Sequence, residues 1–162
     1  MIQKDPAKAM KWLKMAAEHG SAEAKERLAK LEEQQKTLAL LEWDKINNNL
    51  IVITRIKDRN VNEIYVPDFV EGKKVFKIGT FAFLKFSNLK EIHLPKSLQS
   101  IGACAFYGCR SLKEIRLPDS LKFIDSNAFE NCNNLKKIYL SRQNYKKFKH
   151  RFPETAEFII HD

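Results

Sequence analysis

Apolar residues recur every 23 positions in the second half of this 162-residue chain. Five columns keep this spacing over three repeats: Ile78, Ile101 and Ile124; Phe83, Phe106 and Phe129; Leu89, Leu112 and Leu135; Ile92, Ile115 and Ile138; Leu94, Leu117 and Leu140. A column of small residues accompanies them at Ala82, Ala105 and Ala128. Self-similarity at a fixed period of this length indicates a stack of equivalent structural units.

The phrase L-x-x-I-x-L in each repeat predicts one short strand per coil, stacked on the next strand at about 4.8 Å. The pattern therefore predicts an α+β chain with a solenoid of about four 23-residue coils. Burying about seven apolar side chains per coil contributes on the order of 10–20 kcal/mol. Fixing the backbone of one coil costs at least as much, at roughly 1–2 kcal/mol per residue. A single coil is therefore not stable alone, and both ends of the stack need caps.

Candidate caps flank the repeats on both sides. Upstream, the β-prone segments 38–43 and 50–56 are separated by Asn47, Asn48 and Asn49, which predicts a β-hairpin. Downstream, Tyr145, Phe148 and Phe152 share one face of a predicted helix that Pro153 ends, and residues 158–160 form a predicted last strand. We therefore expect a domain at 37–162 with a hairpin cap and a helical cap.

Residues 1–36 have the 3.6-residue period of helices, interrupted at Gly20. We predict a helix, a glycine turn and a second helix whose N-cap is Ser21. Trp12 and Met15 are expected to take part in helix packing. This helical hairpin is too small to fold alone, so we expect it to pack on the solenoid or on further helical repeats.

The repeats at 41–162 resemble BspA-like leucine-rich repeats, because residues 89–109 and 112–132 follow the phrase L-x-x-I-x-L-P-x-S-L-x-x-I-G-x-x-A-F-x-x-C closely. The pattern departs at Asp125, which replaces a glycine, and at Phe86, which replaces a cysteine. Residues 5–31 resemble a single Sel-type repeat, a relative of the tetratricopeptide repeat, at Ala9, Trp12, Ala16, Ala17, Gly20, Ala22, Ala24 and Leu28. The two resemblances imply a scaffold for protein contacts without catalytic residues, and BspA-like proteins are often found on microbial surfaces.

In each predicted strand, the residues that flank the inward isoleucine point to the open concave face. One outward column is Tyr65, His93, Arg116 and Tyr139, and the other is Glu63, Glu91, Glu114 and Lys137. Aromatic and arginine side chains are common anchors of protein interfaces. We therefore expect a protein partner of unknown identity to contact Tyr65, His93, Arg116, Tyr139, Glu91, Glu114 and Lys137. The alternative is that these are solvated strand residues, with glutamate and arginine pairing across coils.

The charge pattern supports a second hypothesis. Residues 136–151 carry seven of the positive charges and no acidic residue, so the remaining residues contribute only +2 to the net charge of +9. Such a segment could bind nucleic acid or another polyanion by counterion release. The residues for this alternative are Lys136, Lys137, Lys146, Lys147, Lys149 and Arg151. No base-reading motif accompanies them, which favours a solvated cap and argues against nucleic acid.

Catalytic, cofactor and metal chemistry are not expected. The four histidines, at 19, 93, 150 and 161, are predicted to lie on separate elements, and the glycines are isolated, so no phosphate loop is present. Cys104, Cys109 and Cys132 lack metal-ligand spacing and are expected to be reduced, although a disulfide between Cys109 and Cys132 stays open. We therefore predict a chain that is not an enzyme and has no cofactor or metal.

The longest apolar runs are too short for a membrane span, and we see no signal peptide in the sequence. These features leave the compartment undetermined: cytoplasmic as the sequence stands, or cell surface or secreted if a signal has been removed. The sequence also does not determine the oligomeric state.

Overall fold

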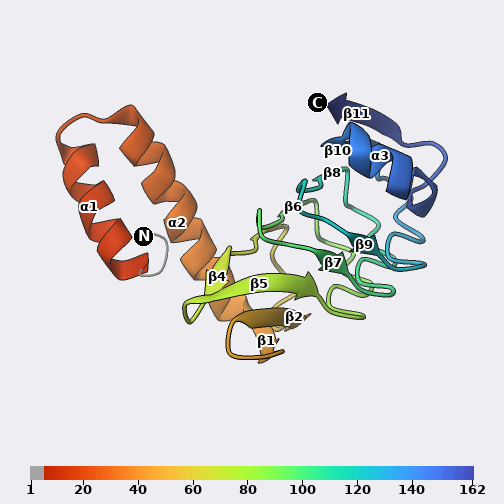
Figure 1. The fold of residues 1–162 in the computed structure, drawn as a ribbon, viewed down its shortest axis with the longest axis horizontal. Coiled ribbons are helices and arrows are strands. Elements are labelled where there is room, and N and C mark those ends of the chain that lie inside the picture. Colours follow the sequence, from red (N-terminus) through yellow and green to blue (C-terminus); the bar gives the residue numbers. More distant parts are fainter. Residues whose placement is uncertain (1–5) are drawn as a thin grey trace.

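The computed structural model describes residues 6–162 as a helical hairpin joined to a strand-rich solenoid (Figure 1). The helices are α1 (Pro6–Glu18), α2 (Ala22–Leu40), α3 (Arg142–Phe148) and the short 3-10 helix η2 (Lys149–Arg151). The strands are β1 (Leu41–Lys45), β2 (Leu50–Ile56), β3 (Glu63–Tyr65), β4 (Phe69–Val70), β5 (Lys73–Ile78), β6 (Glu91–His93), β7 (Ser100–Ile101), β8 (Glu114–Arg116), β9 (Phe123–Ile124), β10 (Lys137–Ser141) and β11 (Glu157–His161). Residues 1–5 of the predicted N-terminal unit lie outside the described residues.

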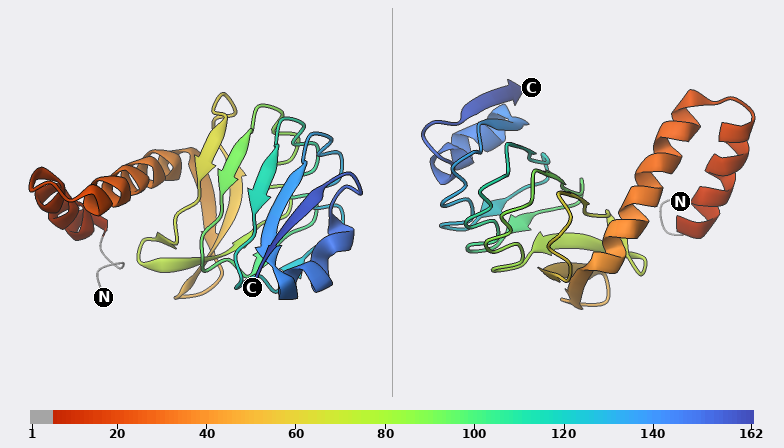
Figure 2. Two further views of the ribbon diagram at one scale, coloured as in Figure 1. Left: turned by 90° about the horizontal axis from the view of Figure 1, so that it is seen from above. Right: turned by 180° about the vertical axis from the view of Figure 1, so that it is seen from behind.

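Helices α1 and α2 form the predicted hairpin and extend away from the solenoid (Figure 1). Gly20 makes the turn with a φ of 92°, and the side chain of Ser21 accepts a hydrogen bond from the amide of Ala24 at 3.2 Å, as an N-cap does. The expected packing of Trp12 and Met15 was wrong, because these side chains are 65% and 44% exposed. Helix α1 packs on α2, and no other element of residues 6–162 lies beside its outer face (Figure 2).

The second helix continues beyond the predicted end of the helical unit. A strand was expected from Leu38, but α2 runs to Leu40 and the strand starts at Leu41. The reason is tertiary: Leu38 and Leu40 pack against the solenoid core from the helix. The hairpin of β1 and β2 is confirmed as an antiparallel pair, and its turn is closed by a 2.8 Å hydrogen bond from the Asn49 amide to the Asn47 side chain.

Two sets of parallel strands run along the solenoid (Figure 2). The prediction of one strand per coil was wrong, because the repeats carry two short strands each, β6 with β7 and β8 with β9. One set is β2, β5, β7 and β9, with β1 at its edge. The other set consists of the paired strands β3 and β6 and the three-stranded sheet β8, β10 and β11. We use the term concave strand face for the outward side of β3, β6, β8, β10 and β11. The 23-residue period is kept in the pairing, since Ile78 lies opposite Ile101 and Ile101 opposite Ile124.

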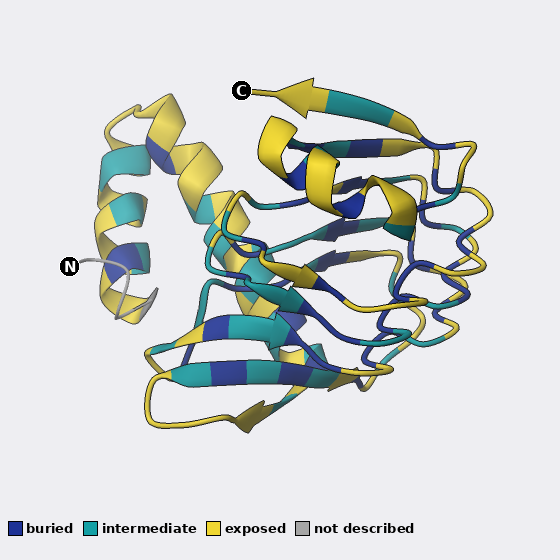
Figure 3. Ribbon diagram, turned by 45° about the vertical axis from the view of Figure 1, so that its right-hand side comes forward, coloured by how far each residue is buried: buried dark blue, intermediate teal, exposed yellow. Residues whose placement is uncertain are grey.

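The predicted columns form one continuous core (Figure 3). Leu89, Leu112 and Leu135 are at most 1% exposed. The rings at positions 83, 106 and 129 stack in parallel with centroids 5.2 Å apart, and Phe152 of the C-terminal cap continues the stack at 4.7 Å. The cap therefore extends the core of the coils, as the sequence predicted.

Two corners of each coil require left-handed backbone. Phe81, Cys104 and Asn127 have φ of 52° to 61°, and Lys85, Gly108 and Asn131 have φ of 52° to 71°. Both sets keep the 23-residue spacing. Gly102 has a different role, because a Cβ atom there would lie 2.8 Å from the Thr80 amide nitrogen of the preceding coil. That glycine lets the backbones of consecutive coils approach closely.

The C-terminal cap follows β10. The side chain of Ser141 caps α3, and the buried side-chain amide of Asn144 donates to the carbonyl of Pro118 at 3.1 Å. The helical segment ends before Pro153, and β11 then pairs in parallel with β10, which confirms the predicted last strand and gives the concave strand face five strands. Within residues 6–162, none of the helices combines the length and apolarity that a membrane crossing requires.

Candidate functional site

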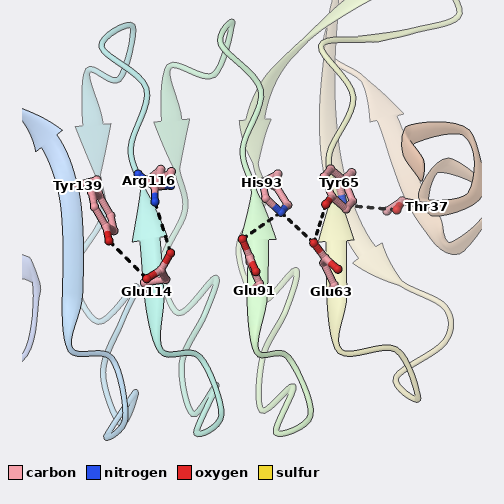
Figure 4. Close-up of polar contacts among 8 residues, drawn as sticks. All are labelled: Thr37, Glu63, Tyr65, Glu91, His93, Glu114, Arg116 and Tyr139. Atoms are coloured by element: carbon pink, nitrogen blue, oxygen red, sulfur yellow. Dashed lines mark hydrogen bonds and ion pairs between the residues drawn. The ribbon is translucent and has the colours of Figure 1, made fainter. Parts of the chain in front are cut away.

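The structure places the predicted binding residues on one surface, the concave strand face (Figure 4). Tyr65 lies opposite His93 in the pairing of β3 with β6, and Arg116 lies opposite Tyr139 in the pairing of β8 with β10. The acidic column has the same register, with Glu63 opposite Glu91 and Glu114 opposite Lys137. Alternation of side chains along a strand brings residues i and i+2 to the same face, which explains why the two columns lie side by side.

In the N-terminal half of this face, one histidine contacts two glutamates. The Nε2 atom of His93 lies 3.0 Å from Glu63 Oε1 and 3.2 Å from Glu91 Oε1. The imidazole stacks on the Tyr65 ring at a centroid distance of 4.0 Å and an angle of 7°. The hydroxyl of Tyr65 donates to Glu63 at 2.6 Å; this bond lowers the pKa of the Glu63 carboxyl and raises the pKa of Tyr65 to about 12.

In the C-terminal half, an arginine is held between a carboxylate and an aromatic ring. The Arg116 guanidinium lies 3.7 Å from the centroid of the Tyr139 ring and 3.5 Å from a carboxylate oxygen of Glu114. The hydroxyl of Tyr139 also reaches Glu114 at 3.5 Å. Glutamate and arginine therefore pair within one strand and not across coils as the alternative interpretation expected, and the Arg116 side chain is still 62% exposed.

A small pocket lies between the two halves of the concave strand face. Strands β6 and β8 are neighbours but are not joined in one sheet. The pocket there has a volume of about 190 Å³. Its polar lining comes from Lys30 of α2, Glu91, His93, Lys96, Glu114 and Arg116. The sequence does not indicate this interruption, because Glu91 and Glu114 keep the same 23-residue spacing as Glu114 and Lys137.

The arrangement of stacked coils agrees with a comparison of the sequence with known families. The BspA type leucine-rich repeat region matches residues 54–157. This chain belongs to the BspA type leucine-rich repeat family. The resemblance predicted from the repeats is thereby confirmed, whereas the Sel-type interpretation of the helical hairpin stays a prediction.

Solved structures with a similar fold are bacterial leucine-rich repeat proteins. A leucine-rich cell surface protein of Faecalibacterium prausnitzii is 18% identical with a TM-score of 0.50, and the match covers 75% of this chain and 37% of that one. A leucine-rich repeat protein of Bacteroides ovatus is 22% identical with a TM-score of 0.45, over 70% and 36% of the two chains. One from T. pallidum is 22% identical with a TM-score of 0.38, over 63% and 69%. No curated protein matches the chain significantly.

This BspA type chain thus spans little more than a third of the Faecalibacterium and Bacteroides proteins. At 18% identity, the likeness to the Faecalibacterium protein shows the fold of the repeats alone. It carries no information about individual side chains of the concave strand face.

The basic residues of the alternative hypothesis are divided by the fold. Lys137 lies on the concave strand face, with Glu114 and Glu157 in register on its two neighbouring strands. Lys146 and Lys147 are exposed on α3, and Lys149 lies 5.5 Å from the centroid of the Tyr145 ring. Lys137 therefore has acids beside it in space, although its run has none in the sequence, and this weakens the positive potential at that position.

Two residues that contact Tyr65 or His93 were not among the predicted binding residues. Glu63 completes the contacts of His93, and the column pattern already contained it. Thr37 is buried in α2, and its hydroxyl accepts a hydrogen bond from the Tyr65 amide at 3.3 Å. Thr37 thus caps the free edge of β3, and only the docking of α2 on the solenoid shows this.

The cysteines are free thiols in the structure. Cys109 and Cys132 are buried and donate hydrogen bonds to the carbonyls of Phe83 and Phe106, at 3.2 and 3.0 Å. A hydrogen bond with Cys132, together with burial, raises the pKa of the Cys109 thiol. These two residues fill the core as small apolar side chains.

Proposed function

We propose that this chain is a non-catalytic protein-interaction module that binds its partner through the concave strand face. The observation that carries the proposal is the pairing of Tyr65 with His93 and of Arg116 with Tyr139 in neighbouring strands of one open surface. Leucine-rich repeat chains in general act as interaction modules, and their extended repeat surface is what they offer to a partner.

The stacked side chains are suitable anchors because they are already ordered. Immobilising a flexible side chain on binding costs about 0.5–1.5 kcal/mol. Arg116 is oriented by the ring of Tyr139 and the carboxylate of Glu114, and His93 is oriented by the ring of Tyr65 and two carboxylates. A partner therefore meets a surface whose aromatic and arginine groups lose little further freedom.

The size of this pocket favours a protein partner over a small-molecule substrate at the concave strand face. Sites for drug-sized ligands usually have about 300–1,000 Å³. The pocket between β6 and β8 has about 190 Å³ and fits one side chain of a partner. The non-catalytic role is supported by the separation of the histidines. His93 lies on β6, His19 follows α1, His150 lies in η2 and His161 lies in β11.

The proposal includes the cellular location of this chain. The Faecalibacterium protein is described as a cell surface protein. We extend that location to this chain, and protease treatment of intact cells of the source organism tests it. Loss of the chain from treated cells is expected, and full protection would contradict a surface location.

The test compares two triple variants in quantitative capture of cross-linked partners. Tyr65→Ala, His93→Ala and Arg116→Ala together should lower capture of the partner at least tenfold. The matched control is Lys77→Ala, Lys122→Ala and Phe123→Ala, on or directly before the strands of the opposite set, which should leave capture unchanged. Equal effects of the two triple variants would contradict a role of the concave strand face.

The basic residues of the C-terminal cap are tested in the same assay. Charge reversal at Lys146, Lys147 and Lys149 should have no effect on a partner that binds the concave strand face. Binding to a polyanion would instead fall steeply between about 50 and 200 mM salt and would be abolished by the charge reversal. That result would replace the proposed function by the electrostatic alternative.

A further inference from the structure

Three side chains with metal-ligating atoms meet at one point of the concave strand face (Figure 4). One carboxylate oxygen of Glu63, one of Glu91 and a ring nitrogen of His93 all lie within 4.8 Å of one another. The ligands come from paired positions of β3 and β6, so hydrogen bonds between the two strands fix their spacing. The sequence alone predicted no metal site, because Glu63 is 28 residues from Glu91.

The two separations from His93 match those of ligands that share an ion. Ligands about 2.1 Å from one ion lie roughly 3.0 Å apart in octahedral and roughly 3.4 Å apart in tetrahedral geometry. The Nε2 atom of His93 is 3.0 Å from Glu63 and 3.2 Å from Glu91. An ion could therefore be held by this nitrogen and the two carboxylates with small side-chain adjustments.

The imidazole has more acceptors around it than it can satisfy. A neutral imidazole nitrogen carries at most one proton, whereas two carboxylate oxygens face Nε2 of His93. The ring cannot easily turn away, because it is stacked on Tyr65. The hydroxyl of Tyr65 also holds Glu63 in place, the kind of outer hydrogen bond that orients metal ligands.

We propose that Glu63, Glu91 and His93 bind one divalent transition-metal ion of the zinc class. An imidazole nitrogen with carboxylates suits Zn²⁺ or Ni²⁺, whereas Mg²⁺ and Ca²⁺ prefer oxygen ligands alone. The adjoining pocket leaves room for water as a further ligand. The other charged groups near the site are Lys30 and Glu33 on α2, Lys96, and Arg116 on β8. Arg116 forms an ion pair with Glu114.

The test is calorimetric titration of the full chain with Zn²⁺, Ni²⁺ and Mg²⁺ at neutral pH. Every protein carries Cys104→Ser, so that the half-buried thiol does not compete for the metal. We expect one Zn²⁺ or Ni²⁺ per chain, with affinity at least tenfold weaker in His93→Gln and in Glu63→Gln. His150→Gln, at an exposed histidine of η2, is the matched control and should bind as the parent does.

A paramagnetic readout separates this site from other surface groups. Ni²⁺ should broaden the ring resonances of His93 and Tyr65 before those of the other histidines and tyrosines. Circular dichroism checks the fold of each variant, and Glu91→Gln replaces any variant that does not fold.

The proposal is overturned if no stoichiometric binding is observed, if Mg²⁺ binds as tightly as Zn²⁺, or if His150→Gln weakens binding as much as His93→Gln. None of these results affects the proposed function, which the triple variant of the concave strand face tests separately.

Discussion

Truncation of one ring in the phenylalanine stack should destabilise the solenoid strongly. Phe106 is fully buried, and its ring lies 5.2 Å from the rings of both Phe83 and Phe129. Phe106→Ala removes the burial of the ring, worth about 1.5–3 kcal/mol, and two aromatic contacts, each worth about 0.5–1.5 kcal/mol. We therefore expect a loss of about 4–5 kcal/mol, the upper part of the usual range for such changes.

The upper part of the range is expected because the stack cannot collapse into the cavity. The spacing of the coils beside Phe106 is fixed by backbone hydrogen bonds of 2.8 Å, from Phe83 to Ala105 and from Phe106 to Ala128. The rings on either side are therefore held at their positions while the space between them is empty. A cavity that does not relax costs more than one that does.

The measurement is urea-induced unfolding followed by circular dichroism. Phe123→Ala is the matched control, since Phe123 is 67% exposed and the substitution is chemically identical. That variant should change the free energy of unfolding by no more than about 0.5 kcal/mol. The reasoning is refuted if Phe106→Ala costs less than about 2 kcal/mol, or if the two variants cost the same.

Three further predictions concern the backbone, the strand edge and the thiols. Gly102→Ala should destabilise the fold by about 2–3 kcal/mol in urea unfolding, because the added Cβ meets backbone atoms of the preceding coil at 2.8 Å. Gly72 faces open space with a φ of 72°, so Gly72→Ala should cost about 1 kcal/mol. Thr37→Val should cost about 1 kcal/mol and speed hydrogen exchange of the β3 amide that its hydroxyl caps, and Thr37→Ser should restore protection. In a thiol assay on the native protein, Cys104 should react while Cys109 stays unreactive even at about pH 9, because its raised pKa keeps it protonated there; fast reaction of both would contradict the structure.

The sequence predicted the repeating part of the fold well, and the reason is visible in the columns. Every inward position from Ile78 to Leu140 occurs in several coils, so each coil independently supports the same assignment. The outward columns were predicted from the alternation of side chains around the inward isoleucine of each coil. The structure pairs their residues, with Tyr65 beside His93 and Arg116 beside Tyr139. Non-repeating segments gave no such check: α2 extends to Leu40, and Trp12 is exposed.

The sequence by itself thus determined which residues face the core and which face outward, because a coil that buries the wrong side chains cannot stack on an identical neighbour. Only the tertiary structure decided how the outward residues meet: His93 between two glutamates, Arg116 over Tyr139, and the interruption between β6 and β8. Such contacts depend on differences of a few ångströms between coils and on the docking of α2. A periodic pattern, which treats all coils as equal, does not contain that information.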